Sequence, residues 1–395
     1  MSSILTFNAG SSSLKIGVFD TKKSLAALAS ASIEGIGQKT QTFMSTRLSD
    51  VSTSSSNVSC TNHTEAASYA LQWLKNIDLI PRDVSAVGHR IVHGGALYHS
   101  AQLVSQQMLD DIRPLAEIDP EHMPASLATI EKIQESLPNV PHVVCFDTAF
   151  YRDLPKVASR LPLPRKYHDL GLRRYGFHGL SYKYLLQEFR SNEGVDAANG
   201  RIIFAHLGSG ASLCATKHGS PVDTTMGFSP AGGIPMSTRS GDIDPSVAWF
   251  LHRTAGQSPS QIQKTLSQES GLLGVSGSTS DMRTLLELQQ TDRRASEAVE
   301  LFCYSVAKSI GSLSATIGGL DSLVFSGGIG ERSAEIRQRV CSNLKYLGVV
   351  LDDNRNANSE RLISRLGSPA GVHVIPTNES QMIARETELI VKGRN

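Results

Sequence analysis

One sequence plan occurs twice in this chain, near its start and again just after its midpoint. The segment SILTFNAGSSSLKIGVF opens the chain and RIIFAHLGSGASLCAT follows Gly200, each with an apolar strand, a Gly/Ser turn and a second strand. Gly10 and Gly208, one in each turn, stand about half the chain apart. Two such units suggest two related domains that each offer a Gly/Ser loop to the same ligand. The alternative is a pair of ordinary hairpins.

Length and charge define the class of protein. The 395 residues are about twice the usual length of one domain, so two domains are expected. The 38 Lys and Arg residues nearly balance 37 Asp and Glu residues, which leaves no basic excess for nucleic acid or anionic lipid. No run approaches about 18 continuous apolar residues, and residues 1–10 lack the pattern of a signal peptide. We therefore expect a cytoplasmic protein without nucleic-acid or membrane partners.

The cysteines do not form a recognisable framework. There are five of them, an odd number, and they are scattered and never in C-x-x-C spacing. A disulfide scaffold or a zinc site is therefore not expected, and the thiols should be reduced and mostly buried.

Short β-branched or aromatic runs alternate with helix-like periods, which predicts an α/β fold. The polar tract Ser52–Ser59 is interpreted as an exposed loop or hairpin tip. The strand signals cover residues 4–7, 15–19, 140–146, 202–205 and 323–325. The helix signals cover residues 65–75, 126–136, 181–189, 245–254, 279–289, 294–317, 333–344 and 381–391.

The first Gly/Ser turn has the composition of an anion cradle. Consecutive Gly and Ser residues let backbone N–H groups converge, and the hydroxyls add further donors. Asn8 offers an amide at the end of the strand, and Lys15 offers a point charge for a phosphoryl oxygen. The candidate phosphate ligands here are Asn8, Ser11, Ser13 and Lys15.

Two further Gly-rich segments extend this pattern. The second turn contains His206, Gly208, Ser209 and Gly210. The third, SGGIGE, follows the apolar run SLVF, and its backbone suits an adenine or ribose-phosphate; its candidate residues are Gly327, Gly328, Ile329 and Gly330. None of the three matches the P-loop or dinucleotide-binding patterns, and each taken alone is also compatible with a structural turn.

The motifs NAGSSSLK, GHRIVHGG, FDTAF, RRYGFHGLS, HLGSGAS, TRSGDIDP, GLLGVSG, SGGIGE and TNES occur in the order and approximate spacing of acetate kinases. The chain resembles that family over nearly its whole length. The resemblance implies the two duplicated domains of the sugar kinase, Hsp70 and actin superfamily around a central active-site cleft. It implies an N-terminal acyl and phosphate-binding domain of residues 1–148 plus 382–395, and a nucleotide-binding domain of residues 149–381.

The resemblance also implies an activity: reversible, direct in-line transfer of a phosphoryl group from ATP to acetate or a similar acid. A short-chain carboxylate is already ionised at neutral pH and needs no general base. The reaction does need removal of the repulsion between two anions. Arg90 and Arg239 resemble the family's active-site arginines, whose planar forks match both oxyanions. His178 resembles the histidine that stabilises the transition state.

Metal and nucleotide ligands follow from the same resemblance. Asp147 closes the apolar run VVCFD, where an unpaired carboxylate is costly, and Glu379 lies in TNES. The resemblance assigns these two carboxylates to the bound metal, Mg²⁺ or Mn²⁺, with Asn8 beside Glu379, and Asp147 also to catalysis. It places Asp281 and Arg283 at the nucleotide. A helix cap or a salt bridge is the alternative role of Asp147.

The acyl pocket is where the chain departs most from the family. Val92, Phe177 and Pro230 match positions that line the pocket for the substrate methyl group. The usual PLAPLHNP segment, whose leucine closes the pocket, is replaced by PLAEIDPEHMP, in which Ile118 is one candidate for that role. Ser209 stands where the family has asparagine, and Ser237 where it has glycine.

Several alternatives stay open at this point. Propionate or butyrate is an alternative acceptor, because an apolar pocket discriminates one methylene by only about 1–3 kcal/mol. A sugar kinase of the same superfamily and a non-catalytic ATP-binding module are the other two. The resemblance also implies a homodimer.

Overall fold

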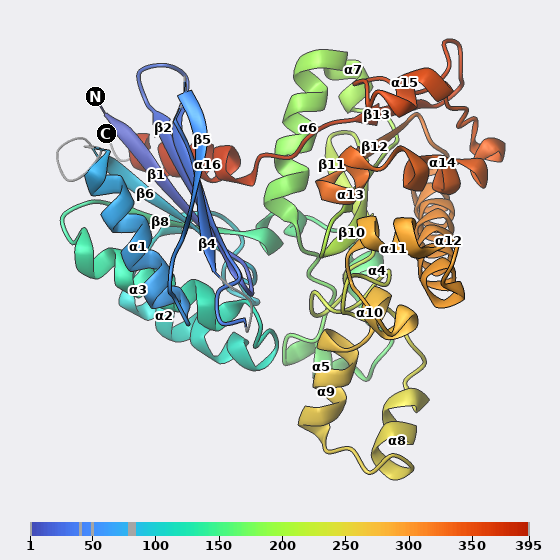
Figure 1. Ribbon diagram of the computed structural model, residues 1–395, viewed down its shortest axis with the longest axis horizontal. Coiled ribbons are helices and arrows are strands. Elements are labelled where there is room, and N and C mark those ends of the chain that lie inside the picture. The colour runs from blue at the N-terminus through green and yellow to red at the C-terminus, as the bar shows by residue number, and fades with distance from the viewer. Residues whose placement is uncertain (1, 39–41, 49–50, 78–83, 394–395) are drawn as a thin grey trace. The chain divides into compact units, whose positions relative to one another are not determined.

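The computed structural model describes residues 2–38, 42–48, 51–77 and 84–393. The chain divides into two compact units. Unit 1 comprises Met1–Arg152, His178–Tyr184 and Asn378–Asn395, and unit 2 comprises Asp153–Phe177 and Leu185–Thr377. Each unit contains one mixed sheet with helices packed on it, which confirms the predicted α/β class (Figure 1).

Unit 1 is built on an eight-stranded sheet of order β5-β4-β3-β2-β1-β6-β8-β7. β1 pairs antiparallel with β2 and parallel with β6, and β6 pairs parallel with β8. The strands are β1 (Ser3–Ala9), β2 (Ser13–Asp20), β3 (Ala26–Glu34), β4 (Phe43–Leu48), β5 (Val51–Asn57), β6 (Val84–Ile91), β7 (Gln102–Leu103) and β8 (His142–Phe146). The helices are α1 (His63–Asn76), α2 (Gln106–Ile112), α3 (Met123–Ser136) and α16 (Glu379–Lys392), with 3₁₀ turns at Arg113–Glu117 and Asp147–Tyr151.

Side-chain alternation along β1 supplies both faces of the core of unit 1. Leu5 and Phe7 pack on the face that α1 and α3 cover. Ile4 points to the other face, where it packs with Ala384 of α16. The period of two in the strand therefore explains why helices lie on both sides of the sheet.

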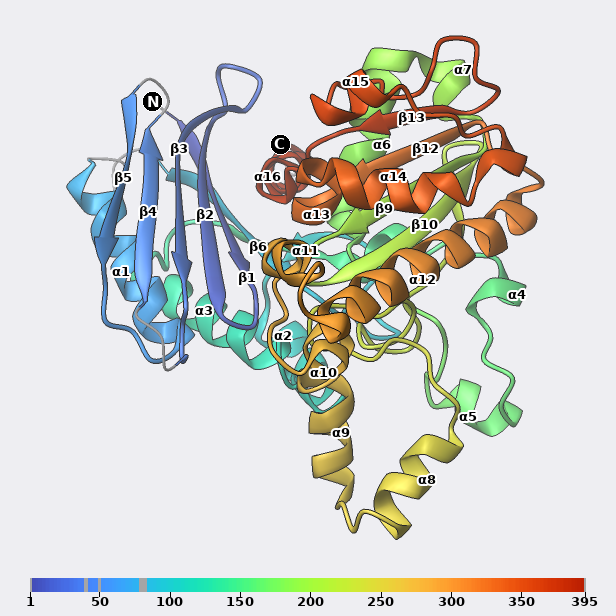
Figure 2. The same cartoon turned by 45° about the vertical axis from the view of Figure 1, so that its right-hand side comes forward.

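Unit 2 contains a five-stranded sheet of order β11-β10-β9-β12-β13, and Figure 2 shows the long helix α12 beside it. The strands are β9 (Ile202–Leu207), β10 (Ala211–Lys217), β11 (Ser220–Thr224), β12 (Ser322–Ser326) and β13 (Gly371–Val374). The helices are α4 (Lys156–Ser159), α5 (Arg165–Asp169), α7 (Val195–Ala198), α8 (Ser246–Arg253), α9 (Pro259–Gln268), α10 (Gly271–Ser276), α11 (Met282–Leu288), α12 (Arg293–Ile317), α13 (Gly327–Arg332), α14 (Ala334–Ser342) and α15 (Asp353–Ala357), with a 3₁₀ turn at Lys345–Leu347. Helix α6 (Gly179–Glu193) begins in unit 1 and continues in unit 2.

Strand order shows that the repeated sequence plan is a structural duplication. In unit 1, β3, β2 and β1 are antiparallel neighbours, and β6 and β8 follow β1 in parallel. In unit 2, β11, β10 and β9 are antiparallel neighbours, and β12 and β13 follow β9 in parallel. The two copies form the hairpins β1–β2 and β9–β10 of this common five-strand order. Two unrelated hairpins would not produce it.

The predicted strands and helices are all present, with small shifts at their ends. The prediction of a loop at Ser52–Ser59 is wrong for most of the tract, because β5 extends to Asn57 and pairs with β4. An edge strand needs no buried face, so its polar composition carries no strand signal. SGGIGE is also not a simple turn: helix α13 begins at its first glycine.

The buried thiols agree with the sequence. All five cysteines are buried and free. Within the described ranges, no helix has both the length and the apolar character to span a membrane.

Candidate functional site

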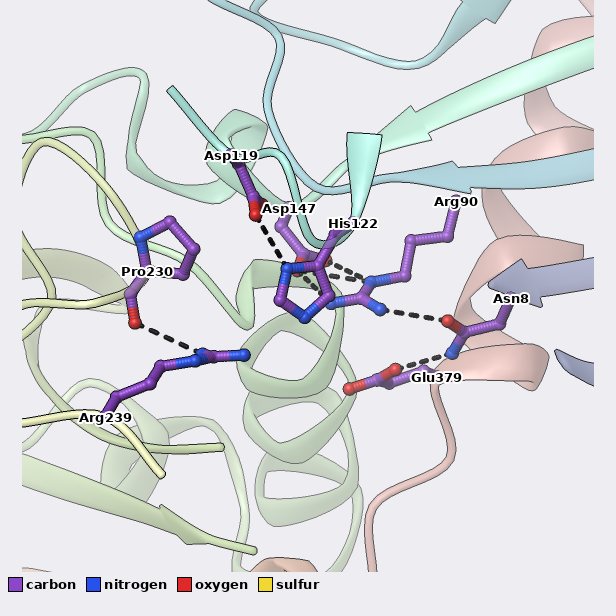
Figure 3. Close-up of polar contacts among 8 residues, drawn as sticks. All are labelled: Asn8, Arg90, Asp119, His122, Asp147, Pro230, Arg239 and Glu379. Atoms are coloured by element: carbon purple, nitrogen blue, oxygen red, sulfur yellow. Dashed lines mark hydrogen bonds and ion pairs between the residues drawn. The ribbon is translucent and has the colours of Figure 1, made fainter. Parts of the chain in front are cut away.

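Three parallel strands of unit 1 bring predicted site residues together at their carboxyl ends. Asn8 is the penultimate residue of β1, Arg90 is the penultimate residue of β6, and Asp147 follows β8 directly. Ligand sites in open α/β sheets form at this edge because the side chains beyond adjacent strands converge there. Glu379, the first residue of α16, completes the group (Figure 3).

The guanidinium of Arg90 is the centre of this group. Its Nε donates to both carboxylate oxygens of Asp147 at 3.1 and 3.2 Å, and its Nη2 donates to Oδ2 at 2.6 Å. Its Nη1 donates to Oδ1 of Asn8 at 3.0 Å, and Nδ2 of Asn8 donates to Glu379 at 2.7 Å. The fork of one arginine is thus held by a carboxylate and an amide in a fixed orientation.

Burial and charge have opposite effects on this pair. Burial lowers the pKa of Arg90, but the carboxylates of Asp147 and Glu379 outweigh it and keep the pKa above the ordinary arginine value. Burial raises the pKa of Asp147, while Arg90 and a backbone hydrogen bond from His178 oppose the rise. Arg90 is therefore a permanent cation, and its partner is kept in place by several hydrogen bonds.

His178 is held in an unusual backbone conformation beside Asp147. Its φ is +56°, a left-handed value that is uncommon for a residue with a side chain. The next residue must be glycine, because a Cβ at Gly179 would collide with the carbonyl oxygen of Asp147. Strained backbone of this kind persists where the surrounding contacts impose it, and it concentrates at functional sites.

A second acid–base pair near Arg90 was not predicted from the sequence. Asp119, only 3% exposed, accepts a hydrogen bond from Nδ1 of His122 at 2.8 Å. The charge of Asp119 contributes to the raised pKa of Arg90. Both residues belong to PLAEIDPEHMP, where the sequence departs from the family pattern. A buried carboxylate therefore stands in the segment predicted to border the acyl pocket.

The turn between β1 and β2 presents the first candidate phosphate ligands. The N–H of Gly10 donates to the carbonyl of Ser13 at 2.8 Å, which closes the turn. Lys15 is exposed on β2 and lies opposite Asn8 in the strand pair, so the two side chains share a face. Ser11 is also exposed. The four predicted residues Asn8, Ser11, Ser13 and Lys15 thus belong to one hairpin of unit 1.

In unit 2, the other two Gly-rich segments lie side by side. β9 and β12 are parallel neighbours, with Ser326 opposite His206. The turn Gly208–Gly210 therefore follows one strand, and α13 follows the other. A Cβ on Gly208 would lie 3.8 Å from the backbone nitrogen of Gly328. Eight predicted residues belong to these two segments: His206, Gly208, Ser209, Gly210, Gly327, Gly328, Ile329 and Gly330.

The loop that carries Arg239 is attached to the same edge of unit 2. The N–H of Ser237 donates to the carbonyl of Ser209 at 3.1 Å, so the two positions that differ from the family motifs contact each other. Nη1 of Arg239 donates to the carbonyl of Pro230 at 3.2 Å (Figure 3). A backbone carbonyl therefore helps to orient this arginine.

The remaining predicted residues are distributed as follows. Val92 is buried in unit 1, whereas Phe177 and Pro230 are buried in unit 2. Asp281 is the N-cap of α11 and accepts from the N–H groups of Arg283 and Thr284 at 2.7 and 3.1 Å. The joint acyl pocket and the nucleotide role of Asp281 and Arg283 stay predictions.

The unit 1 group fits a magnesium ion beside a phosphate. Asp147 and Glu379 supply two carboxylates against the single charge of Arg90, so this set of three carries net negative charge. Asn8 adds an amide oxygen. Magnesium is usually held by one or two carboxylates together with waters and phosphate oxygens, not by a complete protein cage. Within the described part of the chain, no three His, Cys, Asp or Glu residues form such a cage.

This chain is similar to known proteins over nearly its full length. The Acetokinase family model matches residues 3–385. An acetate kinase of Rhodopseudomonas palustris is 40% identical over 397 residues, which covers 99% of this chain and 98% of that protein. The solved propionate kinase of Francisella tularensis has a TM-score of 0.90 at 34% identity and covers 98% of this chain and 99% of its own. The solved acetate kinase of Porphyromonas gingivalis has a TM-score of 0.87 at 34% identity. The match covers 99% of this chain and 100% of that one.

Proposed function

The chain belongs to the Acetokinase family, and from that premise we propose that it transfers a phosphoryl group from ATP to acetate or a similar short-chain carboxylate. The products are an acyl phosphate and ADP, and the reaction is reversible. The observation that carries the proposal is the Arg90 guanidinium, whose side chain is 11% exposed and is held in one orientation by Asp147 and Asn8. An oriented cation is what the encounter of two anions requires.

The chemistry at unit 1 needs no general base. The carboxylate acceptor is ionised at neutral pH, so attack on the γ-phosphorus requires only alignment and neutralisation of charge. Arg90 has five N–H donors, and its hydrogen bonds to Asp147 and Asn8 in the described chain use three of them. The other donors are suited to an oxygen of the substrate carboxylate or of the phosphoryl group in transfer.

Arg239 and His178 are the proposed stabilisers of the transition state. Arg239 is proposed to bind the equatorial oxygens of the phosphoryl group, and its hydrogen bond to the Pro230 carbonyl supports this role because it orients the guanidinium. His178 is proposed to donate a hydrogen bond to the same oxygens. Its constrained backbone supports this role, because a preorganised donor loses little freedom when the reaction occurs.

Magnesium is the proposed metal, with Glu379, Asp147 and Asn8 as the residues that would hold it. A metal ion held there would neutralise part of the phosphate charge. Asn8 is proposed to fix the carboxylate of Glu379 through the 2.7 Å hydrogen bond. Mn²⁺ has the same preference for oxygen ligands.

ATP is proposed to bind unit 2 along the turn Gly208–Gly210 and helix α13. Their neighbouring positions after β9 and β12 support this, because backbone N–H groups at two adjacent strand ends form an anion cradle. The residues of the β1–β2 turn in unit 1 are proposed to contact phosphate. Use of ATP also fits the cytoplasmic location expected from the sequence.

Acetate and propionate are both proposed acceptors. One of the similar solved structures is a propionate kinase and the other an acetate kinase. A pocket wall discriminates one methylene by about 1–3 kcal/mol, so a preference between the two acids is a matter of degree. Val92, Phe177 and Pro230 are the proposed lining residues.

A homodimer is proposed through helix α8, which projects from the rest of unit 2 (Figure 2). Its Trp249 and Phe250 are 64% and 60% exposed, and the preceding Ile243 is 40% exposed. Exposed aromatic groups on one short segment are typical of protein interfaces. The test is the mass of the protein in solution: a dimer that Trp249→Glu converts to a monomer supports the proposal, and a wild-type monomer refutes it.

The function is tested by trapping the acyl phosphate with hydroxylamine. The purified protein is incubated with Mg-ATP and acetate, propionate, butyrate or a sugar panel. We expect a hydroxamate with at least one short acid and none with Arg90→Ala. ADP release with a sugar and no hydroxamate with any acid would assign the protein to another kinase class.

A further inference from the structure

Glu331 forms a compact set of hydrogen bonds within unit 2. Its Oε1 accepts from the backbone N–H of Gly327 at 2.9 Å and from the hydroxyl of Ser326 at 3.4 Å. The same oxygen accepts from the backbone N–H of Thr377 at 3.1 Å. One carboxylate therefore joins the start of α13 to the segment that follows the neighbouring strand β13.

Arg337 holds the other end of the same short helix. It is 0% exposed, and its Nη1 donates to the carbonyls of Gly330 and Glu331, each at 2.9 Å. Its remaining hydrogen bonds go to the side chain and carbonyl of Asn356 and to the hydroxyl of Ser359. A buried arginine thus bonds to the carbonyl groups at the end of α13, which its own helix leaves without partners.

Helix α13 requires such support because its sequence does not favour a helix. Three of its six residues are glycine, the residue that loses most freedom on folding. Gly327 itself has φ +75°, and a Cβ there would lie 2.6 Å from the carbonyl oxygen of Leu207. The glycines permit a close approach of backbone to ligand, but side chains from outside must then fix the backbone.

From these contacts we propose that Glu331 is a positioning residue for the nucleotide. It sets the position of the α13 backbone relative to Thr377 without itself contacting ATP, and Arg337 fixes the opposite end. This inference rests on the proposed role of α13 in binding ATP, and it goes beyond the residues assigned to that role above.

The test compares Glu331→Ala with Glu331→Gln, with Glu335→Ala as the matched control. Glu335 is also in unit 2 but pairs on the surface with Arg339. We expect Glu331→Ala to raise the Kd for ADP, measured by calorimetry, on the order of tenfold, since two backbone hydrogen bonds are lost. Glu331→Gln keeps an acceptor oxygen and should restore most of the affinity. The control should bind ADP as the wild type does.

Two further readouts separate positioning from general stability. Amide hydrogen exchange should accelerate in Glu331→Ala at peptides covering 326–332 and 375–380, and the KM for the acid should stay within about twofold. If Glu331→Ala does not fold, Arg337→Lys provides the second test, because lysine keeps the charge but cannot bridge the same carbonyls. Its ADP affinity should also fall.

Wild-type ADP affinity in Glu331→Ala would overturn the proposal. So would an equal loss of affinity for ADP and for the acid that parallels a fall in Tm, because that result describes a structural residue only. If Glu331→Ala does not fold, unchanged ADP affinity in Arg337→Lys would overturn the proposal. A wild-type protein that binds ADP but forms no acyl phosphate would instead refute the proposed function and leave this inference standing.

Discussion

Replacing Arg90 by lysine keeps the positive charge and removes the planar fork. Lysine can form one ion pair with Asp147, but it cannot reproduce the Nε and Nη2 hydrogen bonds together with the bond to Asn8. Hydrogen bonds to a charged group contribute about 1.5–3 kcal/mol each, and breaking a buried pair completely costs about 3–5 kcal/mol. We therefore expect the free energy of unfolding to fall by about 2–4 kcal/mol, since lysine retains part of the pair.

The effect on turnover should be larger than the effect on stability. If Arg90 orients the anionic reactants, loss of the fork should lower kcat by roughly 10³-fold, by analogy with other arginines that stabilise phosphoryl transfer. The assay is hydroxamate formation at saturating ATP, with thermal unfolding followed in parallel, where we expect Tm to fall by about 5–15 °C. Arg113→Lys is the matched control, because Arg113 and its partner Glu131 are about half exposed. Wild-type kcat in Arg90→Lys would refute the proposed role of the fork.

Three further predictions follow from buried groups. Burial lowers the pKa of His89 and of His142, which are hydrogen bonded to each other at 3.0 Å, so the unfolded chain binds more protons below about pH 6.5. The free energy of unfolding should therefore decrease on acidification from pH 7.5 to 5.5, more steeply in the wild type than in His142→Gln; equal slopes would contradict this. Gly179→Ala should cost about 1–3 kcal/mol and most of the activity, because the added methyl group displaces the Asp147 carbonyl; a fully active, equally stable variant would count against it. Phe177→Leu should raise the ratio of kcat/KM for butyrate over acetate by up to about tenfold, and an unchanged ratio would remove Phe177 from the acyl pocket.

Strong local patterns made much of the fold predictable. Helix α12 has a clear apolar stripe, an Asp292 cap and a left-handed Gly318 at its end, and its predicted range differs from the observed one by a single residue. The repeated hairpin was visible in the sequence because the Gly/Ser turn recurs between apolar strands. Both features depend on residues close together in the chain.

Elements without a local signal were missed. β6 carries Arg90 but reads VSAVGHRI, in which a glycine, a buried histidine and an arginine interrupt the apolar run. The segment forms a strand because it pairs with β1 and β8 in the middle of the sheet. Neighbouring residues in the sequence do not show this pairing. β5 was missed for the opposite reason: it is an edge strand whose serines give no apolar alternation.

Site residues in sequence motifs were predicted, whereas those defined by tertiary contacts were missed. The members of the unit 1 group were predicted from motifs, and their convergence depends on parallel strands far apart in the sequence. Asp119 and Glu331 were not predicted as site residues, because each acts through contacts that depend on tertiary structure. In the sequence, Glu331 of SGGIGE cannot be told apart from an ordinary carboxylate on a helix. Its contact with Thr377 depends on the pairing of β13 with β12.

Phosphorylation of a carboxylate is tested by whether acyl phosphate forms from Mg-ATP and a short-chain acid. Hydroxylamine trapping across acetate, propionate and butyrate measures this without a coupling enzyme. We expect a hydroxamate with acetate or propionate that depends on ATP and is lost in Arg90→Ala and Arg239→Ala. Absence of hydroxamate with every acid, from a folded protein that binds ATP, would contradict the proposed phosphorylation of a carboxylate.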